Sequence, residues 1–172
     1  MKYGKDPNVR TPKRTWELTL SEAERILINS LGDFILPIPT GYLQPSEINI
    51  AVFFDEWISA PYVDQQNDSA ILLKGLKEVE LESQLKYGVS FYDLLPLQKK
   101  SVLDDIISST DGINFFYKFR YLLLGGYYTS DPGFNAIGYI GNIPLNHFPA
   151  PSMEAQQMIK TELTRLGLPS DI

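Results

Sequence analysis

The chain has 172 residues, of which 44% are hydrophobic and 21% charged, so it is long enough to bury the core of one ordinary domain. Its net charge of −6 disfavours nonspecific binding to nucleic acid or to an anionic membrane. Because cysteine is absent, disulfides and thiolate-held metal clusters are excluded.

The first 17 residues predict a basic N-terminal arm, because five basic residues precede any helical pattern. These residues are Lys2, Lys5, Arg10, Lys13 and Arg14. An apolar stretch of the kind found in secretory signals does not follow them, since Trp16 and Glu17 come next. A run of about 18 apolar residues, the length that spans a bilayer, is not found either, so no direct membrane span is predicted.

Two helices are predicted after this arm. A capping box of Thr19 and Glu22 is expected to open the first helix, which Pro37 ends. Pro45 stands where a first helical turn tolerates proline, so a second helix is predicted from Pro45 to Pro61.

Three more helices follow in the middle of the chain. The third is predicted to begin near Asp68 and to end before Gly88, and the fourth follows Pro96. The fifth is rich in aromatic residues, and Gly125-Gly126 is expected to end it because glycine weakens a helix interior. Its apolar residues at helical spacing are Phe116, Phe119, Leu122 and Leu123.

The last predicted helix has Ser152 as its N-cap and Gly167 at its end. Strand-like alternation does not rival these helical patterns anywhere in the sequence. We therefore predict an all-α fold, a single-domain bundle of about six helices over residues 18–172. A long irregular segment, residues 131–151, precedes the last helix and exceeds the usual length of helix–helix loops.

Residues 131–151 are too apolar for a flexible linker, so they either fold back over the core or lie against a partner. After Gly125-Gly126 the chain is polar, rich in tyrosine and punctuated by glycine, a composition suited to docking. The residues assigned to a partner interface are Tyr127, Tyr128, Phe134, Gly138, Tyr139, Gly141, Asn142, Ile143 and His147.

Candidate residues for catalysis or metal binding are few. His147 is the single histidine, so a metal site would need carboxylates for nearly all of its other ligands. The adjacent residues of Asp55-Glu56 and of Asp104-Asp105 point to different faces of a helix, and we predict that these side chains are solvated. We therefore assign no catalytic, cofactor-binding or metal-binding residue.

Four segments, in their order and spacing, resemble the gluconate 2-dehydrogenase subunit 3 family from Leu18 to Asn142. They are LTLSEAERILINSLGDFILPIP, VFFDEWI, GVSFYDLLPLQKKSVLDDI and FFYKFRYLLLGGYYTSDPGFNAIGYIGN. The ending, with GYYTS, GYIGN and then Pro144 and Leu145, looks closest to members paired with glycoside 3-dehydrogenase-type flavoproteins.

This resemblance implies a non-catalytic small subunit without a cofactor of its own. Its partner would be a large FAD-containing dehydrogenase subunit of the glucose-methanol-choline type, often joined by a multihaem cytochrome c subunit. Small subunits of the family support folding of the large subunit and commonly carry a twin-arginine signal, which implies a periplasmic location. Lys13-Arg14 is not such a motif, so a cytoplasmic location is the alternative.

Two other functions remain open at this point. The first is a free-standing helical enzyme or carboxylate–metal protein, for which Asp55, Asp104 and Glu22 would have to converge in one pocket. The second is an adaptor in another complex.

Overall fold

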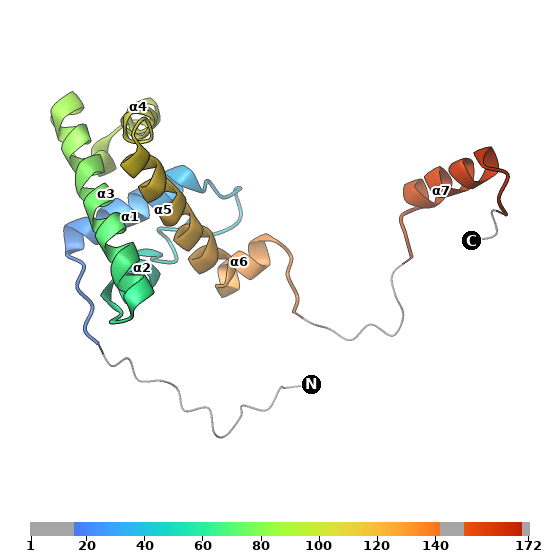
Figure 1. Cartoon of the computed structure of the whole chain (residues 1–172), viewed down its shortest axis with the longest axis horizontal. Helices are drawn as coiled ribbons and strands as arrows, with labels where there is room; N and C mark the ends of the chain where they lie inside the picture. The colour runs from blue at the N-terminus through green and yellow to red at the C-terminus, as the bar shows by residue number, and fades with distance from the viewer. Residues whose placement is uncertain (1–15, 142–149, 170–172) are drawn as a thin grey trace, which may run out of the picture. The chain divides into compact units, whose positions relative to one another are not determined.

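The computed structural model describes residues 16–141 and 150–169, and over these residues the secondary structure is helical, as the all-α prediction requires (Figure 1). The described residues fall into two units, one that ends at Tyr139 and one that begins at Ile140. The sequence predicts a single domain over residues 18–172. The helices are α1 (Glu22–Ile35), α2 (Ala51–Ser59), α3 (Val63–Tyr87), the short 3₁₀ helix η1 (Phe91–Asp93), α4 (Pro96–Ile106), α5 (Thr110–Tyr128), α6 (Asp131–Ala136) and α7 (Met153–Arg165).

The long helix α3 is the centre of the first unit, because it packs against α1, α2, α4 and α5. It lies beside α5, which crosses the unit next to it (Figure 1). The two helices approach closely at Gly75, where an added Cβ atom would lie 2.1 Å from the ring of Phe115. On its other side α5 packs against α2, and the ring centroids of Phe119 and Phe54 are 4.7 Å apart.

A buried carboxylate fixes the start of α1 against α2. Asp55 is 0% exposed, so the prediction that it is solvated is wrong. Its Oδ1 accepts hydrogen bonds from the N–H groups of Thr19 and Leu20, at 3.0 and 3.1 Å, and from the Ser59 hydroxyl at 3.0 Å. Its Oδ2 lies 2.6 Å from Nη2 of Arg25. These partners offset the large cost of removing a carboxylate from water.

The capping box of α1 lies two residues later than predicted. Ser21 is the N-cap, and its hydroxyl accepts a 3.3 Å hydrogen bond from the Glu24 N–H. The Glu24 carboxylate accepts a 2.8 Å bond from the Ser21 N–H in return. Thr19 lies before the helix, where its hydroxyl bonds the Ser59 hydroxyl at 2.9 Å and its N–H donates to Asp55.

The start of α2 and the end of α5 also differ from the predictions. Helix α2 begins at Ala51 instead of Pro45, because Asn49 takes a left-handed conformation (φ 53°) that interrupts a helix. Helix α5 continues through Gly125-Gly126 to Tyr128. At Gly126 an added Cβ atom would lie 2.6 Å from Cδ1 of Phe53, so this glycine permits close helix packing.

The predicted start of α3 near Asp68 is wrong, because this helix begins at Val63. Other predicted boundaries are confirmed. Gly88, at φ 72°, ends α3 in the left-handed conformation, and Pro96 occupies the first turn of α4. The hydroxyl of Ser152 accepts a hydrogen bond of 3.2 Å from the Ala155 N–H and so caps α7. The segment 131–151, expected to be irregular, begins with the short helix α6.

Replacing Asp55 with alanine is expected to lower the free energy of unfolding by about 3 kcal/mol, because it leaves Arg25 and two backbone N–H groups without their partner. Urea denaturation followed by circular dichroism measures this loss. Asp104→Ala is the matched control. Asp104 is exposed and pairs with Lys100 four residues away, so its loss should cost less than about 0.5 kcal/mol. Equal effects of the two changes would show that the buried pair does not anchor the fold.

The two adjacent glycines of α5 should respond to alanine in opposite directions. Gly126→Ala forces Phe53 to move and is expected to destabilise the chain by about 1–3 kcal/mol. At Gly125 nothing lies within 4 Å of an added Cβ atom, so Gly125→Ala should stabilise the helix by up to about 1 kcal/mol. The same denaturation assay compares them, and a stabilising Gly126→Ala would contradict the close contact of α5 with α2.

Candidate partner interface

One residue predicted to contact a partner belongs to the core instead. Tyr127 is 0% exposed, and its hydroxyl donates a hydrogen bond of 2.6 Å to the carbonyl oxygen of Leu43. Burial is the main cause that raises the pKa of Tyr127, so the hydroxyl stays protonated and remains a donor at neutral pH. The assignment of Tyr127 to an interface is therefore wrong.

Five other predicted residues lie at or near the surface. Tyr128 is half-buried against the core, and Phe134 is half-buried with its ring centroid 5.0 Å from that of Tyr139. Tyr139 is 48% exposed, and Gly138 and Gly141 are exposed with positive φ. Their contact with a partner stays a prediction. The other three assigned residues lie outside the described part of the chain: Asn142, Ile143 and His147.

Helix α5 is apolar on its outer face as well as on its buried face. Four exposed side chains at intervals of four, four and three residues form this outer face, which we call the α5 stripe: Ile113, Tyr117, Tyr121 and Leu124. Tyr121 is 71% exposed. Exposed apolar side chains gathered on one helix face have the character of a surface that another protein covers.

A cavity of about 500 Å³ lies beside the α5 stripe, between α2 and α5. We call it the α2–α5 groove. Because Gly125 has no side chain, the wall that α5 contributes is open at that point. The residues that line the groove are mainly apolar: Phe53, Trp57, Tyr121, Leu122, Leu124, Gly125 and Thr129.

A buried carboxylate holds the tryptophan of this groove in place. The indole N–H of Trp57 donates a 3.0 Å hydrogen bond to Oδ2 of Asp68, a residue that is 9% exposed. Oδ1 of the same carboxylate lies 2.8 Å from the ammonium of Lys118 on α5. This network ties together α2, α3 and α5, so the groove is formed before any ligand arrives.

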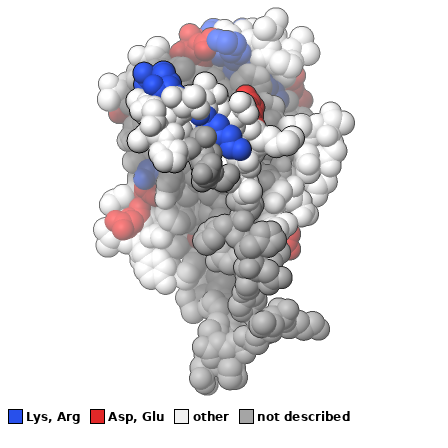
Figure 2. Space-filling view, turned by 90° about the vertical axis from the view of Figure 1, so that its right-hand side faces the viewer, with Lys and Arg blue, Asp and Glu red and all other residues white. Residues whose placement is uncertain are grey.

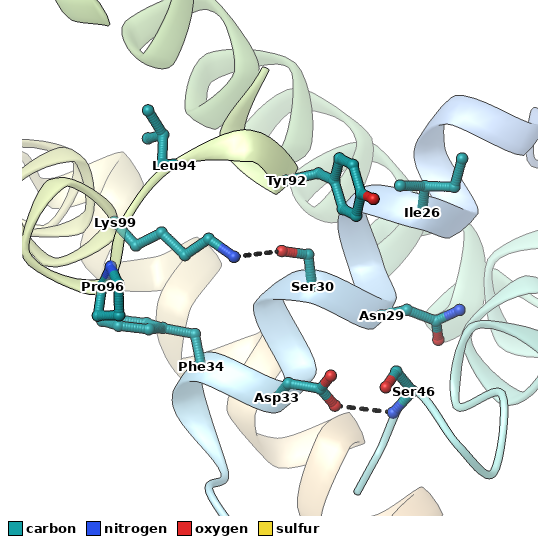
Figure 3. A pocket seen from close by; sticks show the side chains of 10 residues that line it. All are labelled: Ile26, Asn29, Ser30, Asp33, Phe34, Ser46, Tyr92, Leu94, Pro96 and Lys99. Atoms are coloured by element: carbon teal, nitrogen blue, oxygen red, sulfur yellow. Dashed lines mark hydrogen bonds between the residues drawn. The ribbon is translucent and has the colours of Figure 1, made fainter. Parts of the chain in front are cut away.

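A second cavity, of about 520 Å³, lies between α1, η1 and α4, with a polar wall (Figure 3). Its charged groups already have partners within the chain. The ammonium of Lys99 donates to the Ser30 hydroxyl at 2.9 Å, and Asp33 accepts from the Ser46 N–H at 2.8 Å. Burial lowers the pKa of Lys99, while the nearby charges of Asp33 and Asp93 act in the opposite direction. These bonds tie α4 and the turn before α2 to α1, which is a structural role.

The carboxylates named for a metal or catalytic alternative do not come together. Asp55 is in the core, Asp104 is exposed on α4 beside Lys100, as predicted, and Glu22 is exposed in the first turn of α1. Within residues 16–141 and 150–169, the acidic side chains form no group of three or more that could hold a metal ion.

Two further features of the described residues concern binding to charged partners and insertion into a membrane. On the described part of the face in Figure 2, acidic and basic side chains are interspersed among uncharged ones, and neither charge forms a continuous patch. No described helix is both long enough and apolar enough to cross a membrane.

Comparison with protein families gives one result. A model described as gluconate 2-dehydrogenase subunit 3 matches residues 22–149. The match contains α1 to α6, with the α5 stripe and the α2–α5 groove, and stops before α7. Comparisons with curated proteins and with solved structures found no match.

Proposed function

We propose that this chain, which belongs to the gluconate 2-dehydrogenase subunit 3 family, is the non-catalytic small subunit of an FAD-dependent sugar or glycoside dehydrogenase. The family match is the one that the four sequence segments predict. In this proposal, a large flavoprotein subunit of the glucose-methanol-choline type holds the FAD and oxidises the sugar. The small subunit binds no cofactor, and it stabilises the large subunit by assembling with it.

The observation that carries the proposal is the apolar outer face of α5. Tyrosine is enriched at interfaces because it buries a large area while few torsions become ordered, and its hydroxyl can still bind water or a partner. The α5 stripe presents Tyr117 and Tyr121 next to a groove of the size that takes an inserted side chain. Because the Asp68 network fixes Trp57, little entropy is lost when a partner covers the groove.

Apolar side chains are also exposed after α5, in the segment that the sequence assigns to docking. Helix α6 packs against α5, and the residues after it remain exposed. Ile137 is 58% and Tyr139 is 48% exposed. We propose that the α5 stripe, the α2–α5 groove and residues 137–139 belong to the interface with the large subunit.

The finer features of the complex follow the family pattern. We propose a partner of the glycoside 3-dehydrogenase type, a multihaem cytochrome c as a third subunit, and a periplasmic location. Purification from a periplasmic fraction of the native host, followed by visible spectra of flavin and haem, tests all three features. Recovery of the complex only from cytoplasm, or without haem, would contradict the corresponding feature.

Tyr121→Ala is expected to weaken binding of the large subunit at least fivefold, which corresponds to about 1 kcal/mol and marks an important interface residue. The dissociation constant is measured with the tagged small subunit and the purified large subunit, with flavin absorbance as the readout. Tyr92→Ala is the matched control, because Tyr92 is 58% exposed but lines the cavity beside α1.

The control variant should bind within about twofold of wild type. If Tyr92→Ala weakened binding and Tyr121→Ala did not, the interface would lie on the α1 side of the unit. If the wild-type chain bound no flavoprotein, the proposed function itself would be wrong.

A further inference from the structure

The cavity between α1, η1 and α4 has the size and lining of a small-molecule site (Figure 3). Its volume is about 520 Å³, within the range of roughly 300–1,000 Å³ that ligand pockets occupy. Ligand pockets combine an apolar wall with a few polar groups that orient the ligand. The apolar part of this wall consists of Ile26, Phe34, Leu94 and Pro96.

Two opposite charges line this cavity from different helices. The side chain of Lys99 extends from α4 toward Ser30, and Asp33 lies on the same face of α1 as Ser30, three residues later (Figure 3). Both charges have neutral partners, because Lys99 donates to the Ser30 hydroxyl and Asp33 accepts from the Ser46 N–H. These hydrogen bonds therefore position the two charges without neutralising either one.

Neither charge forms an ion pair in the part of the chain that the structure describes. The ammonium of Lys99 lies 5.4 Å from the centroid of the Phe91 ring, a contact that stabilises a cation but leaves its charge in place. Burial is the largest influence on the pKa of Lys99 and lowers it, while the charges of Asp33 and Asp93 raise it less. The ammonium has therefore lost water that no anion of the chain replaces.

The pair of charges selects among small molecules. A simple anion would be attracted by Lys99 and repelled by Asp33, and a simple cation would meet the reverse. A zwitterion is attracted by both, because its carboxylate can accept from Lys99 while its ammonium donates to Asp33. A free amino acid is the smallest common molecule with this pattern, and an apolar side chain matches the apolar part of the wall.

We infer that the cavity between α1, η1 and α4 binds a free amino acid with an apolar side chain. The carboxylate of the ligand pairs with Lys99, its ammonium pairs with Asp33, and its side chain lies against Phe34 and Pro96. A ligand held in this way joins α1 to α4 and stabilises the folded first unit. The cavity shares no lining residue with the α2–α5 groove, so the inference does not rest on the proposed function.

The test measures binding of L-leucine and L-phenylalanine to the full-length chain, at concentrations up to about 20 mM, by calorimetry and by the rise in melting temperature. Isocaproate has the skeleton of leucine without its ammonium, and isopentylamine has it without its carboxylate. Each of these two analogues should bind about tenfold or more weakly than L-leucine, because each loses one charged hydrogen-bonding group.

Two substitutions remove one charge each and keep the kind of group that the chain itself uses. Asp33→Asn retains a carbonyl oxygen for the Ser46 N–H, and Lys99→Gln retains an N–H donor on the side of the Ser30 hydroxyl. Each should weaken binding of L-leucine about tenfold or more. Lys100→Gln is the matched control, because Lys100 is exposed and pairs with Asp104 outside the cavity, and it should bind as wild type does.

Several results would overturn the inference. Absence of binding of both amino acids to the wild-type chain would do so directly. Equal binding by Asp33→Asn, Lys99→Gln and wild type would show that the amino acid binds elsewhere. Equal binding of isocaproate or of isopentylamine would reduce the cavity to a site for a simple anion or cation, and binding of glucose in place of both amino acids would assign it to neutral polyols. Each of these outcomes leaves the proposed function in place.

Discussion

The buried carboxylate of Asp55 and its ion pair with Arg25 join the middle of α2 to the start of α1, which is distant in sequence. This carboxylate binds the backbone before α1 and Arg25 in the first turn of α1. Because a buried charge is tolerated only with all its partners in place, this site allows one arrangement of α1 on α2. Helix α5 packs against α2 through Phe119 and Phe54, so the position of the α5 stripe depends on the same arrangement.

Helix α5 contributes to the fold and to the candidate interface through opposite faces. Its inner face contains the fully buried Phe119, Leu123 and Tyr127, and its outer face presents the α5 stripe. The hydroxyl of Tyr127 also holds the chain between α1 and α2 through the carbonyl oxygen of Leu43. Core packing and this hydrogen bond therefore fix the position of α5 before a partner covers its outer face.

The sequence predicts the helical class and several boundaries because these depend on local patterns. Gly88 and Pro96 act through their own backbone conformations, so their roles can be inferred from neighbouring residues alone. The role of Asp55 depends on groups up to 36 residues away, which no local pattern reveals. Gly126 leaves room for Phe53 of another helix, a contact that no local pattern reveals. The sequence therefore wrongly predicts that this glycine ends α5.

The sequence predicts an interface mainly in the glycine-rich segment after α5 and does not single out the outer face of α5. The α5 stripe is visible in the sequence as a second set of apolar residues at helical spacing, from Ile113 to Leu124. This second set becomes informative only when the other face of α5 is known to be buried. The groove beside it could not be predicted, because α2 and α5 come together only in the folded chain.

Trp57, held by its hydrogen bond to Asp68, is an intrinsic fluorescent reporter of the α2–α5 groove. The sequence contains two tryptophans, and Trp57 lines the α2–α5 groove while Trp16 meets Tyr62 edge-on with ring centroids 5.8 Å apart. Indole fluorescence responds to the polarity around the ring, and the Asp68 bond limits changes in emission that ring rotation would cause. Covering of the groove by a partner is therefore observable as a shift in the tryptophan emission of the chain, to which Trp16 also contributes.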